Sequence, residues 1–154
     1  MRTQVISLYA KINIIFSLVG LIAMGLADVV SAGYRSACPA ITSYVNCTPV
    51  LESVYSKLFG VSLYYYGIAL FSAALVLSII YASSSDAKLR KYIISTLAGG
   101  GLALSGVALY LIYTEIFLVG KICEACTIGH ASIFIIFIVS VLELKRIRKH
   151  RKSR

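Results

Sequence analysis

Four long apolar runs dominate the sequence and decide what the chain can fold into. They cover residues 12–30, 61–82, 92–119 and 127–144. Each reaches the roughly 18 to 20 residues that a helix needs to cross the hydrocarbon layer of a membrane. Because lipid offers no partner for backbone N–H and C=O groups, a helix is the expected form of every run. The sequence therefore predicts an all-α membrane protein, a four-helix bundle in which residues 1–144 form a single domain.

The composition excludes an ordinary soluble domain. Hydrophobic residues make up 59% of the 154 residues and charged residues only 14%, whereas a soluble domain carries about 25% charged residues. The composition is that of a chain which buries most of its surface in lipid, so a multi-pass protein of the cell membrane is expected.

Basic residues are distributed unevenly around the apolar runs. Arg35, Lys57 and Lys121 lie on one side of the predicted membrane. The other twelve of the fifteen lie on the opposite side; they are Arg2, Lys11, Lys88, Arg90, Lys91, Lys145, Arg146, Arg148, Lys149, Arg151, Lys152 and Arg154. Because positively charged segments stay in the cytoplasm, both termini are expected inside the cell and the loop 31–60 outside.

The formal charge of +9 comes largely from the C-terminal tail, residues 145–154. A cytoplasmic basic tail beside anionic lipid headgroups explains it, so no nucleic-acid partner is expected, although nucleic-acid binding is the alternative. The first run resembles a signal peptide in its basic start and in the small residues near Val30, Ser31 and Ala32. Its length favours a retained membrane anchor.

All four cysteines fall on the predicted outer side. Cys38 and Cys47 lie in the loop after the first run, and Cys123 and Cys126 lie at the start of the fourth. Disulfides form and persist outside the cytoplasm. Two structural disulfides are one interpretation, and a set of cysteines that exchange electrons is the other.

The Cys123–Cys126 pair favours exchange. A disulfide that closes so small a loop restricts the unfolded chain little, whereas a helix N-terminus stabilises a thiolate. Glu124 opposes this effect because it is negative. Haem attachment needs histidine directly after the second cysteine, where Thr127 stands. Zinc would find three ligands if His130 joined the pair; we expect no metal site.

His130 follows Cys126 by one helical turn, so both lie on the same face of the fourth run. An ionisable group at this depth needs a partner or a cavity. His130 either bonds to a neighbouring helix or donates a hydrogen bond to a small lipophilic molecule beside Cys126. Two thiols release two electrons when they form a disulfide, and a lipid-soluble two-electron acceptor would arrive from within the membrane.

Two features of the third run have structural interpretations. Glu115 is expected at the membrane interface, where it would reach toward Lys121, and a proton relay is the alternative. A strip of small residues predicts close helix packing, although it could also leave room for a flat ring. The strip contains Ser95, Gly99, Gly100, Gly101, Ala103 and Gly106.

The outer loop contains the pattern of a short amphipathic helix. Thr48 and Pro49 suit the N-cap and the first helical position. Val50, Val54 and Leu58 follow at four-residue spacing, which predicts a helix lying on the membrane surface. Such a helix would hold Cys47 above the Cys123–Cys126 pair.

These residues together resemble the vitamin K epoxide reductase family, in its microbial disulfide-forming branch. The resemblance runs from the first apolar run to the fourth. It rests on the loop cysteines Cys38 and Cys47, the segment LESVYSKLFGV with Ser53 six residues after Cys47, Gly67 in the second run, and the sequence CEAC at 123–126.

The resemblance implies an electron relay from a thioredoxin-like partner to a quinone. By this resemblance, Cys38 exchanges with the dithiol of the partner, Cys47 passes electrons to Cys123, and Cys126 reduces the quinone. His130 would line the quinone pocket and Ser53 would help to close it.

Three departures and contrasts refine this expectation. Many microbial relatives carry a fused thioredoxin-like domain, whereas this chain ends in the basic tail, so a separate partner protein is expected. Leu63 matches a position at which the vertebrate branch has a quinone-contacting asparagine, which favours plain quinone reduction over epoxide chemistry. A second bacterial family of quinone-linked disulfide formers has its Cys-x-x-Cys pair in an early helix. The pair in this chain lies in the last helix, which favours the epoxide reductase family. A non-catalytic scaffold with two structural disulfides is the alternative function.

Overall fold

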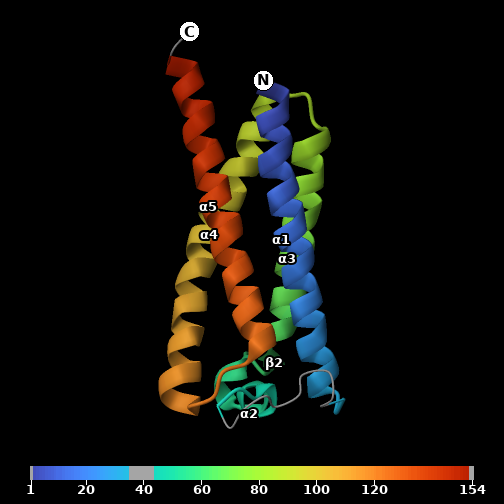
Figure 1. Cartoon of the computed structure of the whole chain (residues 1–154), viewed down its shortest axis with the longest axis vertical. Helices are drawn as coiled ribbons and strands as arrows, with labels where there is room; N and C mark the ends of the chain where they lie inside the picture. Colours follow the sequence, from blue (N-terminus) through green and yellow to red (C-terminus); the bar gives the residue numbers. More distant parts are fainter. Residues whose placement is uncertain (1, 35–43, 153–154) are drawn as a thin grey trace.

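The protein is a bundle of four long helices (Figure 1). The computed structural model describes residues 2–34 and 44–152. The long helices are α1 (Arg2–Ser31), α3 (Leu63–Ser83), α4 (Ala87–Tyr113) and α5 (Glu124–Lys152). Within the described residues, four helical spans are long and apolar enough to cross a membrane. The four-helix membrane bundle predicted from the sequence is confirmed.

The helices are longer than the apolar runs that predicted them. The helix α1 already begins at Arg2, and α5 continues to Lys152, well past the last apolar residue of the fourth run. Hydropathy marks only the part of a helix that can lie in lipid, whereas backbone hydrogen bonding extends the helix beyond it. Lysine and arginine, which follow the fourth run, are good helix formers.

The helix α1 is central to the packing of the bundle. It packs against both α3 and α5, and α4 packs against α5. By contrast, α3 and α4 touch only over a small area. The helix α1 begins and the helix α5 ends at one end of the bundle, whereas the segments that precede α3 and α5 lie at the other end (Figure 1). Which end faces the cytoplasm stays a prediction from the basic residues.

The outer loop is folded into short elements. They are α2 (Cys47–Glu52), the 3₁₀ turn η2 (Val54–Ser56), and the two-stranded hairpin of β1 (Lys57–Leu58) and β2 (Val61–Ser62). Phe59 and Gly60 form the tip of this hairpin, and both have positive φ angles, of 52° and 80°. A short helix in this loop is therefore confirmed.

The extent of that loop helix was wrongly predicted. Asn46, rather than Thr48, is the N-cap, and its side chain accepts a hydrogen bond from the backbone N–H of Thr48 at 3.1 Å. The helix ends at Glu52 because Ser53 has extended backbone and its hydroxyl donates to the carbonyl of Val50 at 2.8 Å. Val54 is consequently 80% exposed instead of sharing the buried face of Val50.

Only part of the predicted small-residue strip on α4 is a packing surface. A Cβ atom at Gly101 would lie 3.1 Å from the backbone Cα of Phe137, so α4 and α5 approach closely here. Gly99, Gly100 and Gly106 face open space, and the prediction of close packing is wrong for them. A strip that is continuous in sequence covers more than one face of a helix.

Polar side chains join the helices in the half of the bundle where α1 begins and α5 ends. The Tyr81 hydroxyl donates to Glu143 at 2.7 Å and accepts from Arg90 at 3.2 Å. Asn13 donates to the hydroxyl of Ser140 at 3.4 Å. Buried polar groups are costly in apolar surroundings unless they are paired, so these bonds favour one register of the four helices.

The contact at Gly101 predicts a local stability effect. Gly101→Val should lower the free energy of unfolding by about 1–3 kcal/mol, because its methyl groups would meet the backbone of α5. Gly100→Val is the matched control, since Gly100 is exposed and its Cβ would meet nothing. Thermal unfolding followed by circular dichroism in detergent measures the difference. Equal midpoints for the two variants would contradict this packing.

Candidate functional site

A main-chain bridge joins the outer loop to the start of α5. The N–H of Ile122 donates to the carbonyl of Tyr44 at 2.9 Å, and the N–H of Asn46 donates to the carbonyl of Ile122 at 3.1 Å. Val45 and Ile122 thereby form a parallel bridge. Because Cys47 follows Asn46 and Cys123 follows Ile122, this bridge brings one loop cysteine to the Cys-x-x-Cys pair.

The cysteines occupy one apolar cluster. Cys47 and Cys123 are fully buried in it, beside Ala27 and Val50, and Cys126 packs against the cluster from one side. Cys47 is disulfide-bonded, whereas Cys123 and Cys126 are free thiols. Cys38, the fourth cysteine expected in the site, lies outside the described residues.

The start of α5 stabilises a thiolate at Cys123. The backbone N–H of Cys126 donates to the Cys123 sulfur at 3.3 Å. The hydrogen bond from the Cys126 thiol, helped by the backbone N–H groups of Cys126 and Ala125, holds the pKa of Cys123 below its usual value, although burial and the charge of Glu115 act in the opposite direction. This is the effect expected at a helix N-terminus.

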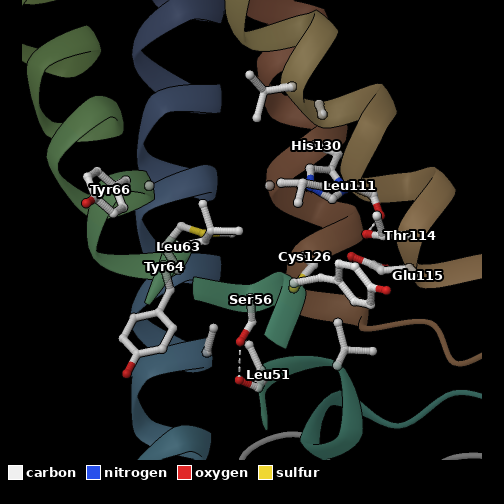
Figure 2. A pocket seen from close by; sticks show the side chains of 18 of the residues that line it. Leu51, Ser56, Leu63, Tyr64, Tyr66, Leu111, Thr114, Glu115, Cys126 and His130 are labelled. Atoms are coloured by element: carbon white, nitrogen blue, oxygen red, sulfur yellow. Dashed lines mark hydrogen bonds between the residues drawn. The ribbon is translucent and has the colours of Figure 1, made fainter. Parts of the chain in front are cut away.

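A cavity of about 260 Å³ lies beside Cys126 (Figure 2). Its walls come from α1, the outer loop, α3, α4 with its π-helical continuation, and α5, and they are mostly apolar. Cys126 is one of the lining residues and Cys123 is not. The two thiols of the pair therefore differ in place, since one faces the cavity and the other lies in the cluster with Cys47.

The residues that the sequence suggested for a pocket all line this cavity. Ser53 lies at the end of α2, Leu63 and Gly67 lie in the first turns of α3, and His130 lies one turn after Cys126. Ser53 and the two α3 residues lie close together in the chain, whereas His130 lies far from them, and the fold brings them all together with the Cys126 thiol.

We infer that the cavity opens toward the lipid-facing surface between α3 and α4. Leu70 of α3 and Val107 of α4 both line it, yet they are 44% and 48% exposed. Because α3 and α4 touch over only a small area, their side chains do not close this gap. A molecule dissolved in the membrane can therefore reach the cavity sideways.

His130 is a buried polar residue in a mostly apolar wall. It is 7% exposed, and its Nδ1 has no hydrogen-bond partner among the described residues. A buried polar atom without a partner is costly. This nitrogen therefore lacks the bond to a neighbouring helix that was one of the two expectations, and it is available to a ligand oxygen.

Glu115 is the second buried polar group of the cavity. It lies in the π-helical turn η3 (Thr114–Val119), is 6% exposed, and accepts a hydrogen bond from the backbone N–H of Cys123 at 3.3 Å. The Lys121 ammonium lies over the ring of Tyr44. The interfacial position expected for Glu115 is therefore wrong. The π-helical turn, which ends at the left-handed Gly120, rotates this carboxylate inward.

Other lining residues carried no signal in the sequence. Tyr55 and Ser56 reach the cavity because the outer loop folds back over it, and Tyr66 reaches it from the first turn of α3. The Ser56 hydroxyl donates to the carbonyl of Leu51 at 2.6 Å, and Tyr66 donates to the carbonyl of Leu58 at 3.2 Å. These bonds fix the loop, and only a three-dimensional structure could have found them.

A metal site finds no support in this arrangement. Within residues 2–34 and 44–152, no group of three or more His, Cys, Asp or Glu side chains is placed to hold a metal ion. The donor set beside the cavity is two thiols, a carboxylate and an imidazole, of which the Cys123 sulfur is turned away into the apolar cluster.

Comparison with known proteins places the chain in a family. No curated protein sequence matched it. Residues 11–141 match the model described as the vitamin K epoxide reductase family. The match spans all four membrane helices and the described cysteines. The chain belongs to the vitamin K epoxide reductase family, a family of oxidoreductases.

Proposed function

We propose that the protein is a membrane thiol–disulfide oxidoreductase which oxidises a thioredoxin-like partner and transfers the electrons to a quinone, and so supports disulfide formation in exported proteins. One observation carries the proposal. The free thiol of Cys126 lies in the wall of an apolar cavity that opens between α3 and α4. A thiol in such a place meets reactants that come from the membrane.

The cavity fits a quinone headgroup. Its volume of about 260 Å³ is near the lower end of small-molecule pockets, which begin at roughly 300 Å³. Its mostly apolar walls suit a flat ring, and the unpartnered nitrogen of His130 suits a carbonyl oxygen. The family is generally associated with quinones. When bound, a quinone supplies a two-electron, two-proton acceptor.

The positions of the cysteines suggest the direction of electron flow. Cys47 and Cys123 share the buried cluster, whereas Cys126 faces the cavity. In the proposed relay, the partner reduces the loop disulfide of Cys47, and the Cys47 thiolate then attacks the Cys123 sulfur of a Cys123–Cys126 disulfide. The loop disulfide forms again, and Cys123 and Cys126 are left as two thiols. These thiols close their disulfide once more when two electrons and two protons leave toward the cavity. Exchange proceeds through a mixed disulfide.

The partner would act at the loop cysteines. We assign Cys38 as the residue that exchanges with the dithiol of a thioredoxin-like protein, with Cys47 as its link to Cys123. The buried position of Cys47 supports this order, because a large partner cannot reach a fully buried sulfur directly. The side of the membrane proposed for this exchange is the non-cytoplasmic one, from the distribution of basic residues.

Three further residues would shape the quinone site. Ser53 closes the cavity from the loop, where its hydroxyl already bonds the carbonyl of Val50. Gly67 lines the cavity and also lets α3 approach Met24 of α1, whose side chain a Cβ there would overlap. Leu63 offers no hydrogen bond, which favours quinone reduction over epoxide chemistry.

A scaffold with two structural disulfides is less well supported. Cys123 and Cys126 are free thiols here, and a structural role would leave the cavity beside Cys126 without a purpose. Thiol trapping distinguishes the two functions. Relay cysteines change their redox state with the quinone pool, whereas structural disulfides stay oxidised in a mild dithiol.

Substitution of single cysteines tests the relay. Cys126→Ser should abolish quinone reduction with every electron donor, because no thiol then faces the cavity. Cys38→Ser should block oxidation of the thioredoxin-like partner and spare quinone reduction by a small dithiol. Quinone absorbance under anaerobic conditions measures both. If Cys38→Ser oxidises the partner at the wild-type rate, or does not reduce quinone with a small dithiol, the relay order is wrong.

Replacement of the imidazole tests the pocket. His130→Leu should raise KM for the quinone by roughly 3- to 10-fold, the equivalent of one hydrogen bond of about 0.5–1.5 kcal/mol. Oxidation of the partner by the Cys47 disulfide in a single turnover should not change. Ser132→Ala is a control on the same helix, since its hydroxyl bonds only its own helix, at the carbonyl of Ile128. An unchanged KM in His130→Leu would exclude the contact.

A further inference from the structure

The carboxylate of Glu115 has a place that the electron relay alone does not explain. It is buried in the wall of the cavity, and within the described residues it is the one carboxylate that lines it. A charged side chain in an apolar, membrane-embedded wall is costly and is retained where it has a task. The relay moves electrons between sulfur atoms, and a carboxylate does not carry electrons. The electron relay therefore gives no reason for Glu115 to be buried here.

Protons must move wherever the thiol pair is oxidised. When Cys123 and Cys126 form one S–S bond, two thiols lose two protons and two electrons. The acceptor gains two electrons and two protons, and a direct transfer would take a proton across the same cavity. The mostly apolar walls provide few bonds for a chain of water molecules. A titratable side chain in the wall would provide a path for this proton.

We propose that Glu115 is the proton carrier between the Cys123–Cys126 pair and the acceptor in the cavity. The proposal rests on the proposed function and adds a catalytic residue to it. In this step Cys123 reacts as a thiolate, whose proton has already left to water and is balanced by a proton that the acceptor takes from water. The Glu115 carboxylate takes the proton of the Cys126 thiol as the S–S bond forms. The same proton then passes from the carboxyl group to an oxygen of the acceptor, and Glu115 returns to its ionised form.

The carboxylate lies in the cavity wall and is bonded to the backbone of the thiol pair. Its Oε2 accepts the backbone N–H of Cys123 at 3.3 Å, which anchors it to the first residue of the thiol pair. Its other oxygen makes no hydrogen bond within the described residues and is available for transfer. Figure 2 shows Glu115, Cys126 and His130 on the same side of the cavity.

The other titratable groups near the cavity are less suited. The hydroxyl of Tyr64 donates to Ser31 at 3.2 Å, and that of Tyr66 donates to the loop carbonyl of Leu58. Tyr55 reaches the cavity from the turn η2 of the outer loop and is 40% exposed. The Lys121 ammonium is turned toward Tyr44. His130 remains as the donor to the acceptor oxygen, at the opposite end of the same path.

A purely structural role would use the same hydrogen bond, so the substitution must preserve it. Glu115→Gln keeps the shape of the side chain and an oxygen that accepts the N–H of Cys123, but it cannot carry a proton. Glu124→Gln is the matched control. It removes a carboxylate from the first turn of α5, beside the thiol pair, and Glu124 does not line the cavity.

The experiment measures single-turnover quinone reduction by the fully reduced full-length protein in lipid nanodiscs. Glu115→Gln should slow the step by about 10²-fold or more, the usual contribution of general acid–base catalysis. Its solvent deuterium isotope effect should rise, because proton transfer then limits the rate. Exchange between a thioredoxin-like dithiol and the Cys47 disulfide should keep its wild-type rate, and Glu124→Gln should not slow quinone reduction.

The outcomes separate this inference from the function on which it rests. Failure of the wild-type protein to reduce any quinone would overturn the proposed function. Quinone reduction by Glu115→Gln at the wild-type rate would overturn the proton carrier alone. An equal loss in Glu115→Gln and Glu124→Gln, with no change in the isotope effect, would also overturn it, because the effect would then be electrostatic.

A measurement on the unsubstituted protein guards against a misfolded variant. Infrared difference spectra of wild-type protein during reduction and reoxidation of the thiol pair should contain a carboxyl C=O band that disappears in Glu115→Asn or Glu115→Gln. A wild-type spectrum without any carboxyl band would overturn the assignment whether or not the variants fold.

Discussion

Two backbone hydrogen bonds to Ile122 hold the chemistry of this protein together. They join the outer loop, at Tyr44 and Asn46, to the residue before the Cys-x-x-Cys pair. Without them, the loop cysteine Cys47 and the pair at the start of α5 would belong to segments with no reason to meet. The bridge uses main-chain atoms, so it does not depend on side-chain identity. It converts two cysteine-bearing segments into one buried cluster.

The apolar surroundings of a membrane raise the energetic cost of every unpaired polar group inside the bundle. At the end where α1 begins and α5 ends, the Tyr81 hydroxyl links Glu143 to Arg90, although Arg90 Nε keeps no hydrogen-bond partner within the described residues. At the other end, Glu115 and His130 are buried in the wall of a cavity that a thiol also lines, and His130 Nδ1 has no partner within the described residues. The first group joins helices to one another, whereas the second faces a space that a reactant can fill.

The sequence predicted the features that depend on local chemistry. The apolar runs predicted the four helices because hydropathy is a local property, and the spacing of Cys126 and His130 predicted that they share a helix face. The sequence-based predictions failed where backbone geometry determines the structure. The end of α2 at Glu52 follows from the hydroxyl of Ser53, and the inward turn of Glu115 follows from a π-helical turn. Neither hydropathy nor residue spacing reports such geometry, and the bridge at Ile122 joins segments far apart in the chain.

The most direct test is to locate a quinone by photo-crosslinking. An azido-quinone irradiated with the protein in a bilayer should label residues of the cavity, such as Leu111 and Ile133, and unlabelled quinone should suppress that labelling. Mass spectrometry of the peptides identifies the sites. Labelling confined to outward-facing residues such as Ile79 and Leu109, and indifferent to unlabelled quinone, would contradict the claim that the acceptor meets the relay at Cys126.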